Sequence, residues 1–287
     1  MEKVRVAIVK GENPSEMVAK ALKLIGYENL VKPEDNVLIK PNYVAAKPPS
    51  TGITTDSKIV ESIIALVKEV GVKEIIVGEG GAGDTEKAFD VVGIRDVAAR
   101  QKVKLVNLNK DERVNIKIPN AKFLKEVGIA KTALNTTCII NVPKLKVHHM
   151  ALVTLSMKNL MGFILPKNIM HENINEKIVE LATLFVDKVK INLVDGLVGS
   201  ETDEVNGNPV KMNVVVAGKD MVATDTISTA IMGINPEKVK YLKLAEERGL
   251  GTATLSNIMV VGEKIENVRR RFQLPPQFQD YPNIRNF

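Results

Sequence analysis

Short apolar runs alternate along the chain with longer segments whose apolar residues recur at helical spacing. Segment 56–71 is typical of the latter, because its apolar residues fall at 59, 60, 63, 64, 67 and 70 and Gly71 supplies a stop signal. Runs rich in Val and Ile predict strands at 4–9, 36–40, 73–77, 102–108, 136–142, 190–194, 213–218 and 257–262. Helices are predicted at 14–25, 56–71, 173–186, 220–232 and 236–248. This alternation predicts an α/β fold with a mostly parallel, helix-covered sheet.

Two segments depart from the alternation. Residues 109–128 are less regular and predict a hairpin or an excursion from a single α/β domain that spans 1–262. The tail, 263–287, contains Arg269–Arg271, the adjacent prolines Pro275 and Pro276, and four aromatic residues. We expect the tail to wrap around the body or a partner subunit of a homo-oligomer, with solvated disorder as the alternative. Within the domain, Asn173 and Glu176 have nearly the spacing of a capping box at a helix start.

Composition narrows the class of protein. The chain has 287 residues, of which 45% are apolar and 26% charged, as in soluble globular proteins. No apolar run approaches the length of a membrane span and the first ten residues read as a strand, so we expect a cytoplasmic protein without a membrane partner. Cys138 is the single cysteine, so the chain cannot build an intrinsic iron–sulfur cluster, and mid-strand it is no candidate nucleophile. The absence of Trp and the abundance of Lys, Glu, Ile and Val are typical of thermophiles.

Charge is distributed unevenly, although the net charge is only +6. Residues 127–171 hold five lysines and all three histidines without any acid, and 36–55 hold two lysines without any acid. Residues 195–204 hold four acids and no base. This asymmetry predicts a cationic wall for an anionic small molecule and a carboxylate wall for a divalent metal. A nucleic-acid partner is disfavoured because Tyr43 is nearly the only aromatic residue among the basic loops.

Polar residues follow the predicted strands, where ligands of open α/β sheets bind if the strands are parallel. They include Lys40, Asn42, the glycine-rich stretch 78–83, Lys144, Lys146, Asp195 and Asp220. Residues 78–83 match G-x-G-x-x-G, but the next strand ends in asparagines where a dinucleotide site needs an acid. The glycines therefore form either an anion-cradling turn or a tight strand–helix connection.

Each charged candidate also has an ordinary structural interpretation. The lysines at 144, 146 and 158 could extend from a surface loop, although their neighbours are apolar. His148 and His149 are adjacent, so in a strand they would point to opposite faces and one at most would enter the site. Asp195 could belong to a turn, and the interpretation of Asp220 as a helix N-cap is favoured over a catalytic role.

Several motifs occur in a characteristic order: LIKPN (38–42), VGEGG (77–81), INVPKLKVHH (140–149), VTLSMKNLMG (153–162), VDG (194–196) and VVAGKDMVATDTISTAIMG (215–233). Together they resemble the family labelled domain of unknown function 362 over nearly the whole chain. Many members carry an added ferredoxin-like module whose cysteines are missing here, and Val147 stands where the family pattern has Thr. Because the chemistry of that family is not generally established, the resemblance implies the layout of a site more than a reaction.

We therefore expect a cleft at the strand carboxyl ends that acts on a phosphate- or carboxylate-bearing small molecule. The expected catalytic residues are Lys144, Lys146, His148, Lys158 and His171, which would stabilise negative charge or move a proton. The expected ligand-binding residues are Lys40, Asn42, Gly78, Glu79, Gly80, Gly81 and Asn159. Asp195 and Asp220 would hold a divalent metal or orient a histidine. A divalent metal is the one cofactor that the residue pattern suggests. The alternatives are a non-catalytic protein that binds an anionic cofactor and a redox accessory that docks a separate iron–sulfur protein.

Overall fold

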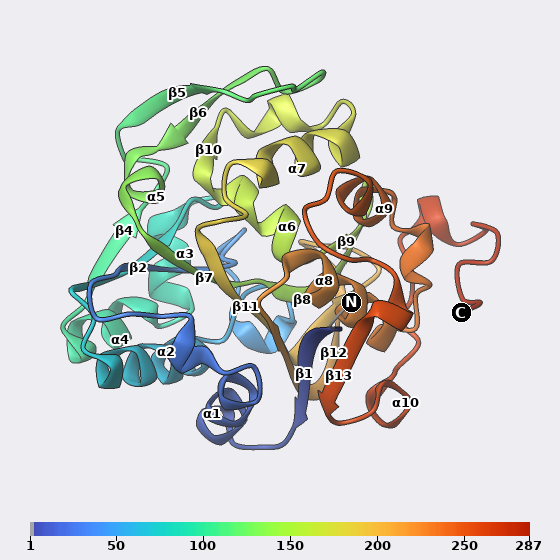
Figure 1. Cartoon of the computed structure of the whole chain (residues 1–287), viewed down its shortest axis with the longest axis horizontal. Helices are drawn as coiled ribbons and strands as arrows, with labels where there is room; N and C mark the ends of the chain where they lie inside the picture. Colours follow the sequence, from blue (N-terminus) through green and yellow to red (C-terminus); the bar gives the residue numbers. More distant parts are fainter. Residues whose placement is uncertain (1–2) are drawn as a thin grey trace.

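The computed structural model describes residues 3–287, which form an α/β fold around one large, mostly parallel sheet (Figure 1). The main path of this sheet has the strand order β13-β1-β12-β11-β7-β2-β3-β4, and β8 pairs with both β11 and β9. The strands are β1 (Val4–Lys10), β2 (Asn36–Pro41), β3 (Glu74–Glu79), β4 (Lys104–Asn107), β7 (Cys138–Val142), β8 (Lys144–His148), β9 (Leu152–Thr154), β11 (Val189–Glu201), β12 (Asn208–Gly218) and β13 (Ile258–Gly262). The predicted fold class is confirmed.

Strand β12 runs against its neighbours. It pairs antiparallel with β11, where Val194 opposes Val216, and antiparallel with β1, where Ile8 opposes Val216. β7, β2, β3 and β4 follow β11 in parallel. The residues after β12 therefore lie at the opposite edge of the sheet from those after β2 and β3, contrary to the expectation that all these loops share one edge.

β11 and β12 are also longer than the sequence predicts. The acidic segment 195–204 is expected to follow a strand that ends at 194, but β11 continues to Glu201 because its backbone pairs with β12 and β8. The two strands form a long hairpin whose tip, residues 202–207, is the only part of 195–207 outside a strand.

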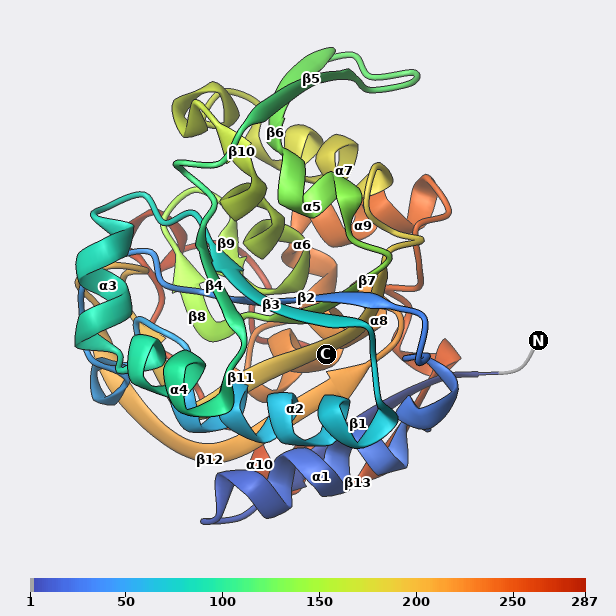
Figure 2. The ribbon, with the colours of Figure 1, turned by 90° about the vertical axis from the view of Figure 1, so that its left-hand side faces the viewer.

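Helices cover both faces of the sheet and bury a separate core on each (Figure 2). Alternate residues of one strand enter different cores: Val37 and Ile39 pack with the helices of one face, and Leu38 packs with those of the other. The first face carries α1 (Pro14–Leu24), α2 (Ser57–Val70), α3 (Thr85–Val91) and α4 (Ile94–Gln101); the second carries α6 (Ser156–Asn159), α7 (Ile174–Thr183), α8 (Met221–Ile231) and α9 (Lys240–Glu247). Short 3₁₀ helices are η1 (Tyr27–Asn29), η2 (Pro49–Thr51), η3 (Leu160–Phe163), η4 (Lys167–Met170), η5 (Pro236–Lys238), η6 (Leu255–Asn257) and η7 (Pro276–Phe278).

Local sequence explains most helix ends, with one exception. Asn13 caps α1 by accepting hydrogen bonds from the Ser15 and Glu16 amides, and Gly71 ends α2 with a φ of 77°. Asn173 precedes α7, but its φ is 53° and its side chain makes no capping bond, so the capping-box prediction is wrong. Glu176 instead pairs with Lys240 of α9 at 2.6 Å, which joins the two helices.

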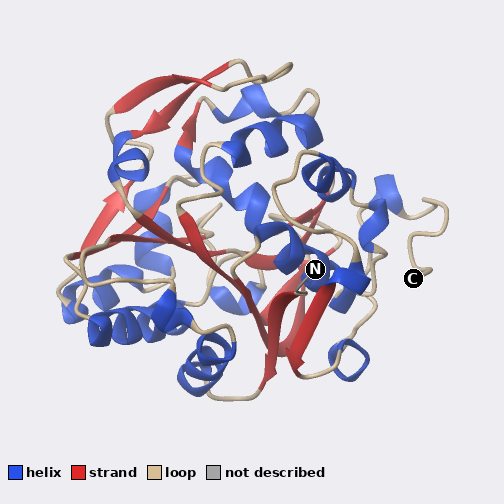
Figure 3. Ribbon diagram, in the orientation of Figure 1, coloured by secondary structure: helices blue, strands red, loops and turns tan. Residues whose placement is uncertain are grey.

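The irregular segment 109–128 supplies most of a hairpin. Strands β5 (Arg113–Lys117) and β6 (Glu126–Ala130) pair antiparallel, and β10 (Ile164–Leu165) completes a separate three-stranded sheet near the top of Figure 3. Helix α5 (Lys131–Asn135) then leads back to β7. Of the two alternatives for this segment, the structure contains the hairpin.

The tail packs on the body of its own chain, at the right of Figure 1. After α10 (Ile265–Val268), the Phe272 side chain is fully buried and its amide donates to the Met232 carbonyl at 3.0 Å. Gln273 accepts a hydrogen bond from the Thr202 amide at 2.9 Å, which ties the tail to the β11–β12 hairpin tip. Across residues 3–287, no helix is long and apolar enough to span a membrane.

Candidate functional site

A cavity of about 190 Å³ lies at the carboxyl ends of β2 and β3 and beside β8. Its polar lining residues are Lys40, Asn42, Glu79, Lys146, His148, His149, Thr154, Lys158, Asn159, Lys167, His171 and Glu204. Its apolar lining includes Met150, Met161 and Ile174. The cavity therefore brings together residues that are as far as 164 positions apart in sequence, from Lys40 to Glu204.

Most of the site residues expected from sequence line this cavity. They are Lys40, Asn42, Glu79, Gly80, Gly81, Lys146, His148, Lys158, Asn159 and His171. The structure does not bring the other four into it, namely Lys144, Gly78, Asp195 and Asp220. Thr154, Lys167 and Glu204 also line the cavity without a predicted role, although Lys167 belongs to the acid-free window and Glu204 to the acidic one.

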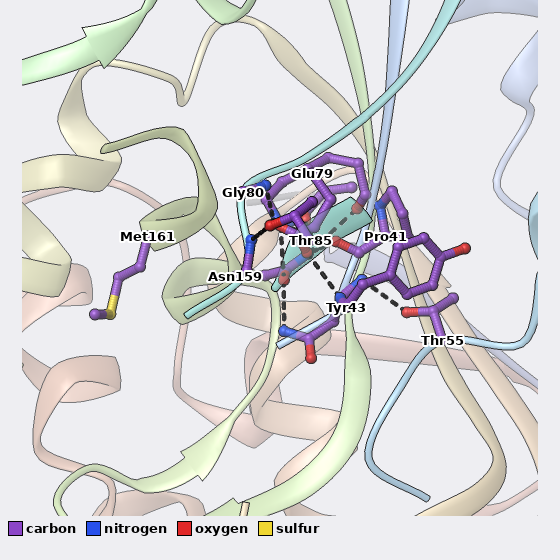
Figure 4. Close-up of polar contacts among 12 residues, drawn as sticks. Pro41, Tyr43, Thr55, Glu79, Gly80, Thr85, Asn159 and Met161 are labelled. Carbon is purple, nitrogen blue, oxygen red and sulfur yellow. Dashed lines mark hydrogen bonds and ion pairs between the residues drawn. The ribbon is translucent and has the colours of Figure 1, made fainter. Parts of the chain in front are cut away.

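Two residues that line the cavity, Lys40 and Glu79, form a buried ion pair, and Figure 4 shows Glu79 beside Tyr43, Gly80 and Asn159. Lys40 Nζ lies 3.1 Å from the Glu79 carboxylate and donates to Asn159 Oδ1 at 3.0 Å. Glu79 also accepts hydrogen bonds from the backbone amides of Tyr43 (2.8 Å) and Gly80 (2.7 Å). Burial lowers the pKa of Lys40, and the neighbouring Glu79 carboxylate opposes that shift. Because both charges are compensated, this pair is a rigid support rather than a source of free charge.

The glycine-rich loop after β3 makes a tight connection. A Cβ atom on Gly80 would lie 2.5 Å from the Gly162 carbonyl oxygen, and one on Gly81 would lie 2.3 Å from that of Tyr43. The Gly80 amide donates to Glu79 and the Gly81 amide to Thr85 Oγ1 at 3.1 Å, so these donors are already used within the protein. The structure therefore favours the tight-connection alternative over the anion-cradling turn. Gly78 lies within β3, behind the cavity.

Lys146 presents an amine at the cavity that is fixed in position by hydrogen bonds. Its Nζ donates to Asn42 Oδ1 (2.8 Å) and to the carbonyl oxygens of Ile53 (3.0 Å) and Glu204 (3.2 Å). These three acceptors match the three donors of an ammonium group. Burial lowers the pKa of Lys146 to about 7, and the positive charge of Lys158 lowers it further in the same direction.

Lys158 and Lys167 also present amines to the cavity. Among residues 3–287, Lys158 Nζ has no hydrogen-bond or ion-pair partner, and burial lowers the pKa of Lys158 to about 8. Lys167 Nζ donates to the carbonyl oxygens of Ile164 (3.0 Å) and Met161 (3.4 Å), and burial lowers the pKa of Lys167 to about 8 as well. Neither amine pairs with a carboxylate in the described part of the chain.

The short helix α6 that carries Lys158 is held from behind. Asp225, fully buried within α8, accepts hydrogen bonds from the amides of Ser156 (2.7 Å) and Met157 (3.0 Å). Asn159, at the other end of α6, donates to Asn141 Oδ1 at 2.8 Å. Burial raises the pKa of Asp225 to about 7 against the opposing effect of these amides. Local sequence gives no signal for this role of Asp225, since Ser156 lies 69 positions away along the chain.

Both adjacent histidines line the cavity, so the expectation that they face opposite ways is wrong. β8 ends at His148, and His149 belongs to the following turn, which lets the two rings stack at 4.8 Å. His149 Nδ1 lies 2.6 Å from Glu204 Oε1, and His148 Nε2 lies 3.6 Å from the same oxygen. Glu204 comes from the β11–β12 hairpin tip, which therefore closes one side of the cavity.

Hydrogen bonding fixes the tautomer of His148. Its Nδ1 accepts from the amides of Met150 (3.0 Å) and Ala151 (3.2 Å), so the proton of the neutral ring resides on Nε2. Burial lowers the pKa of His148 well below its ordinary value, and the charge of Lys158 acts in the same direction. His148 therefore presents a neutral N–H donor to the cavity.

This tautomer bears on metal binding. His148, His149 and Glu204 place one ligand atom each within 4.8 Å of one another, which is the kind of cluster that could hold a metal ion. A metal on His148 Nε2 would require a proton on Nδ1, where two backbone amides already donate. The donor set therefore does not fit a metal ion through His148 in this arrangement.

The two aspartates expected to hold a metal lie apart from the cavity. Asp195 is fully buried and accepts from Lys144 Nζ (2.8 Å) and from the Asp56 amide (2.7 Å). Asp220 caps α8 by accepting from the Ala223 amide at 2.9 Å, and it lies at the opposite sheet edge because β12 is antiparallel. The N-cap interpretation of Asp220 is the one that the structure contains.

One buried hydroxyl in the cavity lacks a partner. Thr154 is only 4% exposed and lines the cavity, and its Oγ1 has no hydrogen-bond partner among residues 3–287. A buried hydroxyl without a partner costs about 1–3 kcal/mol, so such groups usually meet a water molecule or a ligand.

The family model labelled domain of unknown function 362 matches residues 37–230 of the chain. This range includes every residue that lines the cavity. The chain belongs to the domain of unknown function 362 family. The resemblance to this family that the motifs predict is therefore confirmed.

One protein is similar to this chain in sequence and another is similar in structure. The thylakoid-associated protein sll1697 of Synechocystis sp. is 23% identical over 258 residues, which cover 87% of this family member and 79% of the relative. The lactate racemase apoprotein of Thermoanaerobacterium thermosaccharolyticum matches in structure with a TM-score of 0.46 and 14% identity. That match covers 86% of this chain but only 57% of the racemase.

Proposed function

We propose that this protein is a cytoplasmic enzyme that binds and converts a small molecule bearing a phosphate or carboxylate group. The cavity is the proposed site, and Lys146, Lys158 and Lys167 are the proposed anion-binding residues. His148 supplies a neutral N–H donor toward the same space. The proposal requires neither a bound metal nor an iron–sulfur cluster.

One observation carries this proposal: three lysine amines face one small cavity without a carboxylate partner in the described chain. Lys146 is buried and the other two lysines are half-buried, and like charges gathered in one small cavity repel one another unless an opposite charge compensates them. The Glu204 carboxylate also lines the cavity, but its Oε1 is already 2.6 Å from His149 Nδ1. An anionic ligand would supply the missing compensation.

The same residues support a reaction as well as binding. Burial lowers the pKa of Lys158 to about 8 and that of Lys146 to about 7, so the amines approach the range in which they can exchange protons. Thr154 Oγ1 offers a further donor or acceptor to a bound molecule. A protein that only stores an anion has no need for amines poised in this way.

A thermal-shift screen tests the proposal. Sulfate, inorganic phosphate, propionate, pyruvate and glyceraldehyde 3-phosphate would each be added at pH 6.5 to wild type, Lys158→Gln and Lys20→Gln. Lys20 is the matched control because it is exposed on α1 and lies outside the cavity. We expect at least one anion to stabilise wild type and Lys20→Gln but not Lys158→Gln.

The opposite outcomes are equally clear. An anion that stabilises all three proteins equally places binding outside this cavity. If no anion stabilises wild type, the proposed function fails. When a stabilising anion is found, product formation followed by nuclear magnetic resonance distinguishes an enzyme from a binding protein.

A further inference from the structure

Lys158 differs from every other lysine of the cavity in its hydrogen bonding. Lys40 is paired with Glu79, Lys146 has three oxygen acceptors, and Lys167 has two. Within residues 3–287, Lys158 Nζ has none. Its amine is therefore the one whose lone pair, once the proton is lost, remains free to react.

The backbone beneath this amine is held on both sides. The Asp225 carboxylate fixes the amides of Ser156 and Met157, and the Asn159 side chain is bonded to Lys40 Nζ and to Asn141. Lys158 lies between these anchors on α6, so only its own side-chain torsions remain variable. A reactive group is positioned best when its support is rigid in this way.

Burial brings the neutral amine of Lys158 within reach near neutral pH. Burial lowers the pKa of Lys146 further, to about 7, and the positive charge of Lys158 contributes to that shift, so Lys146 loses its proton first as pH rises. Burial lowers the pKa of Lys158 to about 8, so a substantial fraction is neutral at mildly alkaline pH. Lysines desolvated by apolar surroundings commonly form imines with carbonyl compounds.

We infer that Lys158 is a nucleophile that forms an imine with an anionic carbonyl compound, namely a 2-oxo acid or an aldehyde phosphate. This inference rests on the proposed function, and it narrows the substrate to molecules that carry both a carbonyl and an anionic group. Lys167 and the charged fraction of Lys146 would hold the anionic group in the cavity that they share with Lys158, and the carbonyl carbon would meet Lys158 Nζ.

The step balances without an oxidant or a reductant. The Lys158 amine adds to the carbonyl carbon, and the carbonyl oxygen takes a proton as the nitrogen loses one, which gives a carbinolamine. Loss of the hydroxyl group with a further proton releases one water molecule and leaves the C=N bond. His148 Nε2–H and Thr154 Oγ1 are available to hydrogen-bond the carbonyl oxygen as it gains negative charge.

Trapping by cyanoborohydride tests the inference. Wild type would be incubated at pH 8 with pyruvate, oxaloacetate or glyceraldehyde 3-phosphate and the reductant, and the adduct would be located by peptide mass spectrometry. We expect one dominant adduct on Lys158, suppressed by excess sulfate. Lys20→Gln should behave as wild type, and Lys158→Arg, which keeps the positive charge, should lose the adduct while it still binds sulfate.

Propionate separates this inference from the proposed function, because it carries the carboxylate of pyruvate without the carbonyl group. If propionate or sulfate stabilises wild type through Lys158 but none of the three carbonyl compounds gives an adduct there, the imine is refuted and the anion site stands. Adducts spread evenly over exposed lysines refute the imine as well. If no anion binds, both claims fail.

Discussion

Lys144 Nζ lies 2.8 Å from Asp195 Oδ2, and both side chains are completely buried. Asp195 also accepts hydrogen bonds from the amides of Asp56 and Leu197. The pair lies behind the cavity and joins β8 to β11, where Lys144 and Asp195 are register partners. Its contribution is therefore to the stability of the strand that presents Lys146.

Replacing one member of this pair tests that role. Lys144→Met leaves the buried Asp195 charge uncompensated, so we expect the free energy of unfolding to fall by about 3–5 kcal/mol. The double variant Lys144→Met/Asp195→Asn should recover part of this loss, because it removes the orphaned charge. Urea denaturation provides the measurement, and equal stabilities for wild type and Lys144→Met would contradict the account.

Asp225 predicts a second, pH-dependent effect on stability. Burial raises the pKa of Asp225 to about 7 in the folded protein, above its ordinary value of 3.8. Between these two values the folded state holds a proton that the unfolded state has lost, so stability falls as pH rises, by about 1.4 kcal/mol per pH unit from this group. The contribution is lost once pH exceeds the folded pKa.

The variant Asp225→Asn isolates the contribution of Asp225 to the pH dependence of stability. It is needed because burial also raises the pKa values of Asp56 and Asp220. We expect the slope of unfolding free energy against pH, from pH 4.5 to 7, to be less negative in Asp225→Asn than in wild type. Parallel slopes in the two proteins would show that Asp225 is ionised throughout this range.

Anion binding should draw protons into the protein. Burial lowers the pKa values of Lys146 to about 7 and of Lys158 and Lys167 to about 8, and a bound anion favours their charged forms. Affinity for sulfate, which does not titrate near neutrality, should therefore decline as pH rises from 6.5 to 9. Calorimetry at pH 8 in buffers of different ionisation enthalpy should reveal net proton uptake, and its absence would argue against these amines as the anion site.

Glu204 places a negative charge in the cavity, which would repel a bound anion. Its Oε1 contacts His149, and its charge supports the protonated form of Lys158. At pH 6.5, where the lysines are protonated, we expect Glu204→Gln to bind sulfate about tenfold more tightly, equivalent to about 1.4 kcal/mol. The exposed Glu12→Gln serves as the control, and weaker binding by Glu204→Gln would mean that this carboxylate organises the site instead.

The sequence predicts the architecture well because burial dictates it. The Val- and Ile-rich runs become strands whose alternate residues enter two cores, as Val37 and Leu38 illustrate. The direction of β12 cannot be read in the same way, because a strand buried on both faces has the same pattern whether it is parallel or antiparallel. That one reversal moves Asp220 to the far edge of the sheet.

The site was predictable in its charge but not in its pairings. Lys144 and Lys146 are two residues apart and should share a face, yet only Lys146 enters the cavity. Lys144 is instead paired with Asp195, its register partner in β11, and the register then shifts, so that β11 advances five positions to Ser200 while β8 advances two to Lys146. Such a shift in register depends on how the strands pair in the folded chain. The contacts of Glu204 and Asp225 also depend on the tertiary structure, so local sequence does not predict them.

Anomalous diffraction from crystals soaked in tungstate, an analogue of phosphate, tests the central claim most directly. The account predicts an anomalous peak inside the cavity, within hydrogen-bonding distance of Lys158 Nζ, in wild-type crystals and its loss in Lys158→Gln. Peaks confined to the molecular surface, such as the groove lined by Arg269, Arg271 and Arg285, with none in the cavity would contradict it.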